Sequence, residues 1–254
     1  MPLAMDRLSA EQAFHDRQAD LRAATFQMQP SALHVDVDAY LDHESWIRPA
    51  FKQLGDLHGR QVLDFGCGHG MAAVALAKLG AGVTAFDLSP GYLREARRRA
   101  EANGVSIAFA QADGDRLPFA NESFDRIWGN AILHHLDLYR AGPEVQRVLR
   151  PGGVAVFCEP WGENPLLNFT RRRVHYAGKD RTPDEQPLRN RDLAVLRHFF
   201  PIVETRGHQL FAMLRRVLRQ RRVVRTLGRC DDCVLTQIPY LQRFCRYMVL
   251  TLRR

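Results

Sequence analysis

The sequence contains little lysine and has no long apolar run. Of its 36 basic residues only three are lysines, so arginine carries nearly all of the positive charge. No stretch approaches the roughly 18 uncharged apolar residues that a membrane-spanning helix needs. Asp6, Arg7 and Glu11 also interrupt any apolar core of an N-terminal secretion signal. We therefore expect a soluble, cytoplasmic protein.

Cysteine is also scarce. The five cysteines are an odd number scattered through the chain, which argues against a disulfide framework. Cys230 and Cys233 form a single CxxC motif, "CDDC", without a second pair or flanking histidines. Structural zinc sites usually combine four such ligands. We therefore predict two ordinary thiols at a turn and expect no bound metal.

Positive charge is concentrated near the C-terminus. From Thr205 to Arg254 the sequence has 12 arginines and two aspartates, a net charge of +10, whereas the whole chain carries +8. Residues 210–228, "LFAMLRRVLRQRRVVRTLG", predict a basic helix with apolar residues on one face. Such a helix suits an ordinary surface position, which we favour. Peripheral contact of residues 210–225 with an anionic membrane, or contact with nucleic acid, are the alternatives.

Strand and helix patterns alternate through the middle of the chain. A length of 254 residues, 46% of them hydrophobic, suffices for one substantial α/β domain. Alternation of this kind predicts parallel strands joined by right-handed crossovers, hence a doubly wound, mostly parallel sheet. Seven strands are predicted, at residues 61–66, 82–87, 106–113, 124–130, 154–159, 202–209 and 245–254.

Local signals mark where two helices begin. Ser89 followed by Pro90 predicts an N-cap and first helical position, with Gly104 just past the end of that helix. Ser9, with Gln12 three positions on, matches a capping box and predicts a helix start there.

A glycine-rich turn follows the first strand, in "VLDFGCGHG" at residues 62–70. A dinucleotide fold needs GxGxxG so that a helix N-terminus can approach a pyrophosphate, but here Met71 occupies the third glycine position. Asp64 inside the turn would repel a pyrophosphate and suits a cationic amino-acid moiety instead. Asp87, at the end of the second strand, could accept hydrogen bonds from ribose hydroxyls in either type of cofactor.

Four ordered motifs carry a resemblance to a known family. "VLDFGCGHG", "VTAFDLSP", "ADGDRLPFANESFDRIWGNAILHHL" and "LRPGGVAVFCEP" resemble the motifs of class I S-adenosylmethionine-dependent methyltransferases of the small-molecule, type 11-like kind. The match covers about residues 60–160. It implies a Rossmann-like methyltransferase fold and S-adenosylmethionine as cofactor. A related domain that has lost its cofactor is the alternative.

The resemblance also implies roles for individual residues. Asp87 would hold both ribose hydroxyls, Asp113 the adenine amino group, and the backbone carbonyl of Asn130 the ammonium of the cofactor. Tyr40, from the N-terminal helices, is the candidate for closing the site. The full set of implied cofactor-binding residues is Tyr40, Asp64, Phe65, Gly66, Cys67, Gly68, Gly70, Asp87, Leu88, Ala112, Asp113, Gly114 and Asn130.

Methyl transfer is an in-line displacement, so alignment of acceptor, methyl carbon and sulfur is the main task of such an enzyme. A base is needed only when the acceptor carries a proton. His134, His135 and Glu159 are the predicted catalytic candidates, although "LHH" often serves packing and helix capping in this family. His43 and His175 are further candidates with less support.

Residues 1–58 have the pattern of helices and turns and are predicted to form an N-terminal helical cap, followed by the cofactor-binding core at 59–160. The long Pro-, Asn-, Arg- and Gly-rich stretch after Glu159 predicts a substrate-capping insertion at 161–200. Residues 201–254 would complete the same domain with strands and the basic helix.

Substrate-binding candidates lie in the predicted insertion. They are Trp161, Asn164, Arg171 and Arg181. The arginines could clamp a carboxylate or phosphate. The favoured alternative is that they pair with Asp180, Asp184 and Glu185 and shape the loop.

The predicted function is methyl transfer to a small molecule, such as a lipophilic or natural-product-like metabolite. A lipid or membrane-associated substrate is the alternative. Nucleic-acid methyltransferases that flip a base typically carry [DNS]PP[YFW] after the fourth strand, whereas this chain has "NAIL" there. An RNA methyltransferase and a non-catalytic cofactor-binding protein are accordingly less favoured. The sequence predicts neither the acceptor atom nor the oligomeric state.

Overall fold

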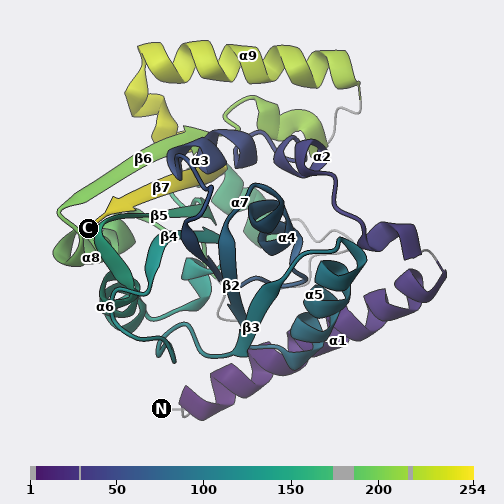
Figure 1. Cartoon of the computed structure of the whole chain (residues 1–254). Helices are drawn as coiled ribbons and strands as arrows, with labels where there is room; N and C mark the ends of the chain where they lie inside the picture. Colours follow the sequence, from purple (N-terminus) through teal and green to yellow (C-terminus); the bar gives the residue numbers. More distant parts are fainter. Residues whose placement is uncertain (1–3, 29, 174–185, 217–219) are drawn as a thin grey trace.

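A computed structural model describes the chain except for residues 1–3, 29, 174–185 and 217–219. Seven strands form one sheet in the order β3-β2-β1-β4-β5-β7-β6 (Figure 1). Strands β1 to β5 run parallel, and β7 runs antiparallel to both β5 and β6. This confirms the predicted doubly wound, mostly parallel sheet. The strands are β1 Gln61–Phe65, β2 Gly82–Asp87, β3 Ile107–Gln111, β4 Phe124–Asn130, β5 Leu149–Pro160, β6 Ile202–His208 and β7 Tyr247–Arg253.

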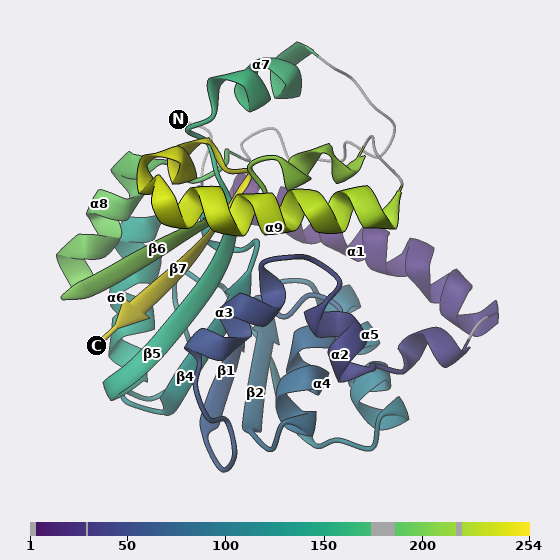
Figure 2. The same cartoon turned by 90° about the horizontal axis from the view of Figure 1, so that it is seen from above.

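Helices cover both faces of the sheet. One hydrophobic cluster joins α2 to α5 with one face, and a second joins α6 and α8 with the other (Figures 1 and 2). In β1, Val62 belongs to the first cluster and Leu63 to the second, as expected for strands buried on both faces. The helices are α1 Ala4–Met28, α2 Val37–Leu41, α3 Ile47–Gln53, α4 Met71–Lys78, α5 Pro90–Ala102, α6 Leu138–Val148, α7 Pro165–Arg173, α8 Asn190–Phe199 and α9 Arg221–Gln237.

The N-terminal helix α1 packs along α5. Asp16 Oδ1 accepts hydrogen bonds from Ser89 Oγ at 2.6 Å and from the Gly91 amide at 2.8 Å. Ser89 also caps α5, as predicted, by accepting from the Tyr92 amide. The predicted helix start at Ser9 is wrong, because α1 already begins at Ala4.

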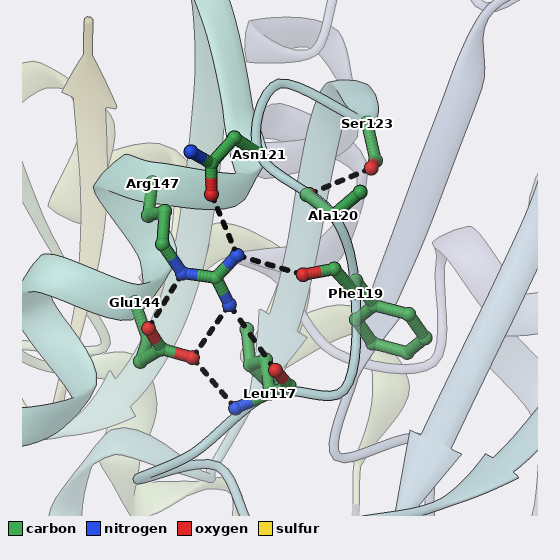
Figure 3. A network of polar contacts seen from close by, with 7 residues as sticks. All are labelled: Leu117, Phe119, Ala120, Asn121, Ser123, Glu144 and Arg147. Atoms are coloured by element: carbon green, nitrogen blue, oxygen red, sulfur yellow. Dashed lines mark hydrogen bonds and ion pairs between the residues drawn. The ribbon is translucent and has the colours of Figure 1, made fainter.

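A polar network fixes the loop between β3 and β4 against α6 (Figure 3). Arg147 donates to both carboxylate oxygens of Glu144, at 2.7 and 2.8 Å, and to the carbonyls of Phe119 and Leu117. Glu144 in turn accepts from the Leu117 amide at 2.7 Å. The loop therefore leaves the end of β3 along a defined path.

The predicted helix over residues 210–228 is wrong in extent. Residues Ala212–Arg216 form a 3-10 helix, η3, and α9 begins at Arg221. Asp231 on α9 is buried, and its carboxylate accepts hydrogen bonds from three consecutive amides that precede and begin η3. These amides belong to Leu210, Phe211 and Ala212, at 3.1, 2.7 and 3.1 Å.

The CxxC motif lies within α9 and not at a turn, which corrects that part of the prediction. Cys230 and Cys233 are exposed free thiols. Within the described ranges, no group of three or more His, Cys, Asp or Glu side chains is arranged to hold a metal ion. No helix in those same ranges is both long and apolar enough to cross a membrane.

Candidate functional site

The glycine turn after β1 is the first part of the site. Gly66, Gly68 and Gly70 have φ values of 69°, 48° and 81°, in the left-handed region that glycine adopts without a Cβ penalty. A Cβ on Gly66 would lie 2.6 Å from Ile132 Cγ1, and one on Gly70 would lie 2.7 Å from Ala96 Cβ. At Gly68 nothing lies within 4 Å of that position. The outer glycines therefore allow close packing, and the middle one leaves open space.

A cavity of about 380 Å³ lies where the turn, the ends of β2 and β4, and the N-terminal helices meet. Its volume falls in the range of roughly 300–1,000 Å³ that is usual for small-molecule sites. Three carboxylic acids, Glu11, Asp64 and Asp87, line it. Among the described residues of its wall there is no lysine or arginine. The cavity is therefore suited to a neutral or cationic ligand and not to a pyrophosphate.

Asp64 is buried beside the turn. Its Oδ2 has no hydrogen-bond partner within the described part of the chain. Burial, together with the nearby charge of Asp87, raises the pKa of Asp64 to about 8. Burial and the neighbouring Asp64 also raise the pKa of the Tyr40 phenol well above its usual value. A cation in the cavity would therefore stabilise the ionised form of Asp64.

Asp87 connects the glycine turn to α5. Its Oδ2 accepts from the Gly68 amide at 2.8 Å, and its Oδ1 accepts from the Ser89 amide at 2.9 Å. Burial raises the pKa of Asp87 to about 6, although these hydrogen bonds oppose the increase. Because each carboxylate oxygen has two lone pairs, Asp87 keeps acceptor capacity for a ligand in the cavity.

Two neighbouring histidines each contact a carboxylate, but in different surroundings. His134 Nδ1 lies 2.7 Å from Glu159 Oε2, and Glu159 Oε1 accepts from the Ile132 and Leu133 amides. Neither His134 nor Glu159 lines the cavity, so this pair holds the loop after β4. His135 does line it, with Nδ1 3.2 Å from Glu11 Oε1.

The structure brings most of the predicted cofactor residues together. The predicted residues that line the cavity are Tyr40, Asp64, Gly66, Cys67, Gly68, Asp87, Leu88, Ala112, Gly114, Asn130 and His135, and the weaker candidate His43 joins them.

Three of the predicted cofactor residues lie elsewhere. The Phe65 ring packs in the core, with its centroid 4.7 Å from that of Phe86. Gly70 approaches Ala96, as described above. Asp113 Oδ1 accepts from the Asp115 amide at 3.0 Å beside the cavity wall.

Trp161 and Asn164, the two predicted substrate residues whose side chains the structure describes, do not line the cavity. Trp161 is buried and forms an isolated β-bridge with Leu188. Asn164 Nδ2 donates to the Phe244 carbonyl at 2.6 Å, so both residues support the chain after β5. Arg171 belongs to α7, but its side chain lies outside the described part of the structure. Arg181 and His175 lie outside the described residues altogether.

Glu11 and His15 line the cavity but were missed by the sequence reasoning as site residues. They reach it because α1 docks on α5, a contact between distant segments that no local pattern reveals. Their spacing of four residues was the available signal, since it places both side chains on the same face of a helix.

Comparison with known proteins gives one family match. A model described as "Methyltransferase domain" matches residues 62–153. Methyltransferase GfsG of Streptomyces halstedii is 41% identical over 107 residues, covering 41% of this chain and 38% of that protein. Demethylmenaquinone methyltransferase of Tropheryma whipplei (strain Twist) is 38% identical over 122 residues, covering 48% of this chain and 50% of that protein. The chain thus spans half or less of the length of these relatives.

The fold has a matching solved structure. A S-adenosylmethionine dependent methyltransferase from Mesorhizobium loti superposes with a TM-score of 0.55 at 21% identity, covering 84% of this chain and all of that chain. At this level of identity the likeness concerns the fold. It extends beyond the matched family segment to most of the sheet and its helices.

Proposed function

We propose that this chain transfers a methyl group from S-adenosylmethionine to a small molecule. Residues 62–153 match a model described as "Methyltransferase domain", and the motifs in that segment resemble those of the class I S-adenosylmethionine-dependent methyltransferases. The charge of the cavity is the observation that carries the proposal. Its wall has three carboxylic acids and, among its described residues, no lysine or arginine. This arrangement suits a ligand with a sulfonium and an ammonium group and opposes a dinucleotide.

The wall residues fit the parts of this cofactor. Asp87 would accept from the ribose hydroxyls, and Leu88, Ala112 and Gly114 would contact the adenine. Asp64, whose Oδ2 has no partner within the described residues, would face the ammonium group with the backbone of Asn130. The open space at Gly68 leaves room for the cofactor to pass close to the turn.

The bound cofactor would supply an activated methyl group on its sulfur. The chain then has to hold the acceptor in line with that methyl carbon and keep water away, which can account for several kcal/mol of the barrier. A small-molecule acceptor is supported by the relative named for demethylmenaquinone. The acceptor itself is left open.

A thermal-shift series with the purified protein tests this proposal. S-adenosylhomocysteine at 100 times its dissociation constant should stabilise the fold by about 2.7 kcal/mol, because it binds the native state alone. NAD⁺ and NADP⁺ at equal concentrations should leave the midpoint unchanged. Stabilisation by a nicotinamide dinucleotide without any by S-adenosylhomocysteine would overturn the proposal.

Peripheral contact with an anionic membrane is the second candidate, for a lipid-associated acceptor. The side chains of Phe211 and Leu214 in the η3 region are 43% and 48% exposed, and residues 215–229 contain seven arginines and no acid. Exposed apolar groups among basic residues favour an anionic interface. Flotation with phosphatidylglycerol vesicles should show binding. In 0.5 M salt this binding should weaken, because the Debye length falls to about 4 Å and screens the attraction between the arginines and the lipid charges. Equal recovery with phosphatidylcholine vesicles, or none with either, would exclude this contact.

A further inference from the structure

We propose that Glu11 and His135 form a general-base pair that deprotonates a neutral hydroxyl acceptor, so that the chain is an O-methyltransferase. His135 would act as the catalytic base, and Glu11 would be the positioning residue that sets its tautomer. The inference rests on the proposed function, because it places the acceptor in the same cavity as the cofactor. Glu11 lies on α1, more than 120 residues away in the sequence, and the structure alone brings it to His135.

The contact between the two side chains fixes the proton on one ring nitrogen. His135 Nδ1 lies 3.2 Å from Glu11 Oε1, and the two side chains are 13% and 11% exposed. An ionised carboxylate can only accept, so Nδ1 carries the hydrogen of the neutral ring. Nε2 then keeps its lone pair on the part of the ring that does not contact Glu11. A ring in this state is prepared to take a proton from a group in the cavity.

The adjacent pair shows why His135 and not His134 has this role. His134 and Glu159 have a similar contact, but their side chains are 3% and 0% exposed and neither lines the cavity. Glu159 is also occupied by two backbone amides. The His134–Glu159 pair is therefore structural, whereas the His135–Glu11 pair is open to a ligand. The first pair can serve as a matched control for the second.

The position of Glu11 is held from the same helix. Five residues further along α1, Asp16 accepts hydrogen bonds from Ser89 and Gly91 at the start of α5. The Tyr92 hydroxyl donates to Gln18 Oε1 at 2.6 Å. These contacts anchor α1 beside the cavity, so Glu11 meets His135 without depending on a bound ligand.

The surrounding wall indicates the class of acceptor. His15, Tyr40 and His43 line the same cavity, and the ring centroid of His15 lies 6.1 Å from that of His135. The described wall offers no arginine or lysine to bind a carboxylate or phosphate, and Glu11 would repel one. A neutral alcohol or phenol can enter without that cost, and its hydroxyl proton is what a base is needed to remove.

The reaction balances with these groups. The acceptor O–H proton passes to His135 Nε2, and the oxygen lone pair forms the new bond to the methyl carbon. The bond from that carbon to sulfur breaks, and its electron pair stays on sulfur. The products are a methyl ether, S-adenosylhomocysteine and a protonated His135, which later returns its proton to water.

Nitrogen-15 NMR of the histidine-labelled protein at pH 8 tests the pair directly. The His135 signals are assigned by their loss in His135→Gln. With S-adenosylhomocysteine bound, we expect the proton on Nδ1 and a non-protonated Nε2. In Glu11→Ala the proton should move predominantly to Nε2, whereas Glu11→Gln keeps an acceptor oxygen and should restore the Nδ1–H form. As a matched control, Glu159→Gln should alter the His134 signals and leave the His135 tautomer unchanged.

Each result decides one part of the account. A wild-type His135 that carries its proton on Nε2, or a tautomer unchanged in Glu11→Ala, would overturn the base assignment. So would a Glu11→Gln variant that behaves like Glu11→Ala. Failure of S-adenosylhomocysteine to bind the wild type would instead overturn the proposed function. In that case the tautomer of the ligand-free protein still tests whether Glu11 sets the His135 proton.

Discussion

Cofactor affinity should depend on pH through Asp64. Burial raises the pKa of this carboxyl to about 8, so at pH 6 to 7 it is mostly protonated in the cofactor-free protein. The ammonium group of S-adenosylhomocysteine, placed beside Asp64, favours the ionised form of this carboxyl, so binding must release a proton. If only the ionised form binds tightly, affinity for S-adenosylhomocysteine should rise about 50-fold between pH 6 and pH 8 and then level off. Asp64→Asn should remove this dependence.

The variant should also weaken binding at pH 9, where Asp64 of the wild type is ionised. Loss of a charge-assisted hydrogen bond costs about 1.5–3 kcal/mol, which corresponds to roughly a 10- to 150-fold lower affinity. Isothermal titration calorimetry in two buffers with different ionisation enthalpies measures both the affinity and the released proton. A wild-type affinity that is flat from pH 6 to 8, or an equal pH slope in Asp64→Asn, would refute the assignment.

Three further predictions concern the same site and its supports. The raised pKa of Asp64 in the folded state means that this group stabilises the ligand-free fold at low pH, and that the contribution is lost as the pH rises through about 8. In urea unfolding, Asp64→Asn should therefore be more stable than the wild type at pH 9 but not at pH 4. Asp87→Ala should lower the affinity for S-adenosylhomocysteine about 10-fold or more in calorimetry, because it removes the hydrogen-bond acceptor for the ribose and the contact with the Gly68 amide. An unchanged affinity would contradict the ribose assignment. Gly66→Ala should lower the free energy of unfolding in urea by about 1–3 kcal/mol, because position 66 has a positive φ and a Cβ there would contact Ile132. An unchanged urea midpoint would show that the turn accommodates the Cβ without strain.

The sheet and the glycine turn could be predicted from the sequence because their signals are local. Apolar runs of strand length alternate with helical patterns, and Ser89 and Pro90 mark the start of α5, where the structure places it. Polar residues at strand ends meet at one edge of a parallel sheet, which is why Asp64, Asp87 and Asn130 share a cavity.

What could not be predicted depends on contacts between distant segments. Glu159 ends a strand as an active-site acid would, but its carboxylate is taken by amides of the loop after β4. Asp231 on α9 accepts hydrogen bonds from the amides of residues 210–212, so this segment packs on α9, whereas the amphipathic pattern had predicted one continuous helix. Glu11 becomes a site residue only through the docking of α1. In each case a buried carboxylate contacts a backbone or side-chain group that is distant in the sequence.

The central claim is that the acidic cavity at the strand ends holds S-adenosylmethionine. A crystal structure of the complex with S-adenosylhomocysteine tests it most directly. We predict the ribose hydroxyls within hydrogen-bond distance of Asp87, the ammonium group on the Asp64 side, and the sulfur facing the space beside His135. A molecule bound outside this cavity, or one inside it with its ribose away from Asp87, would contradict the account.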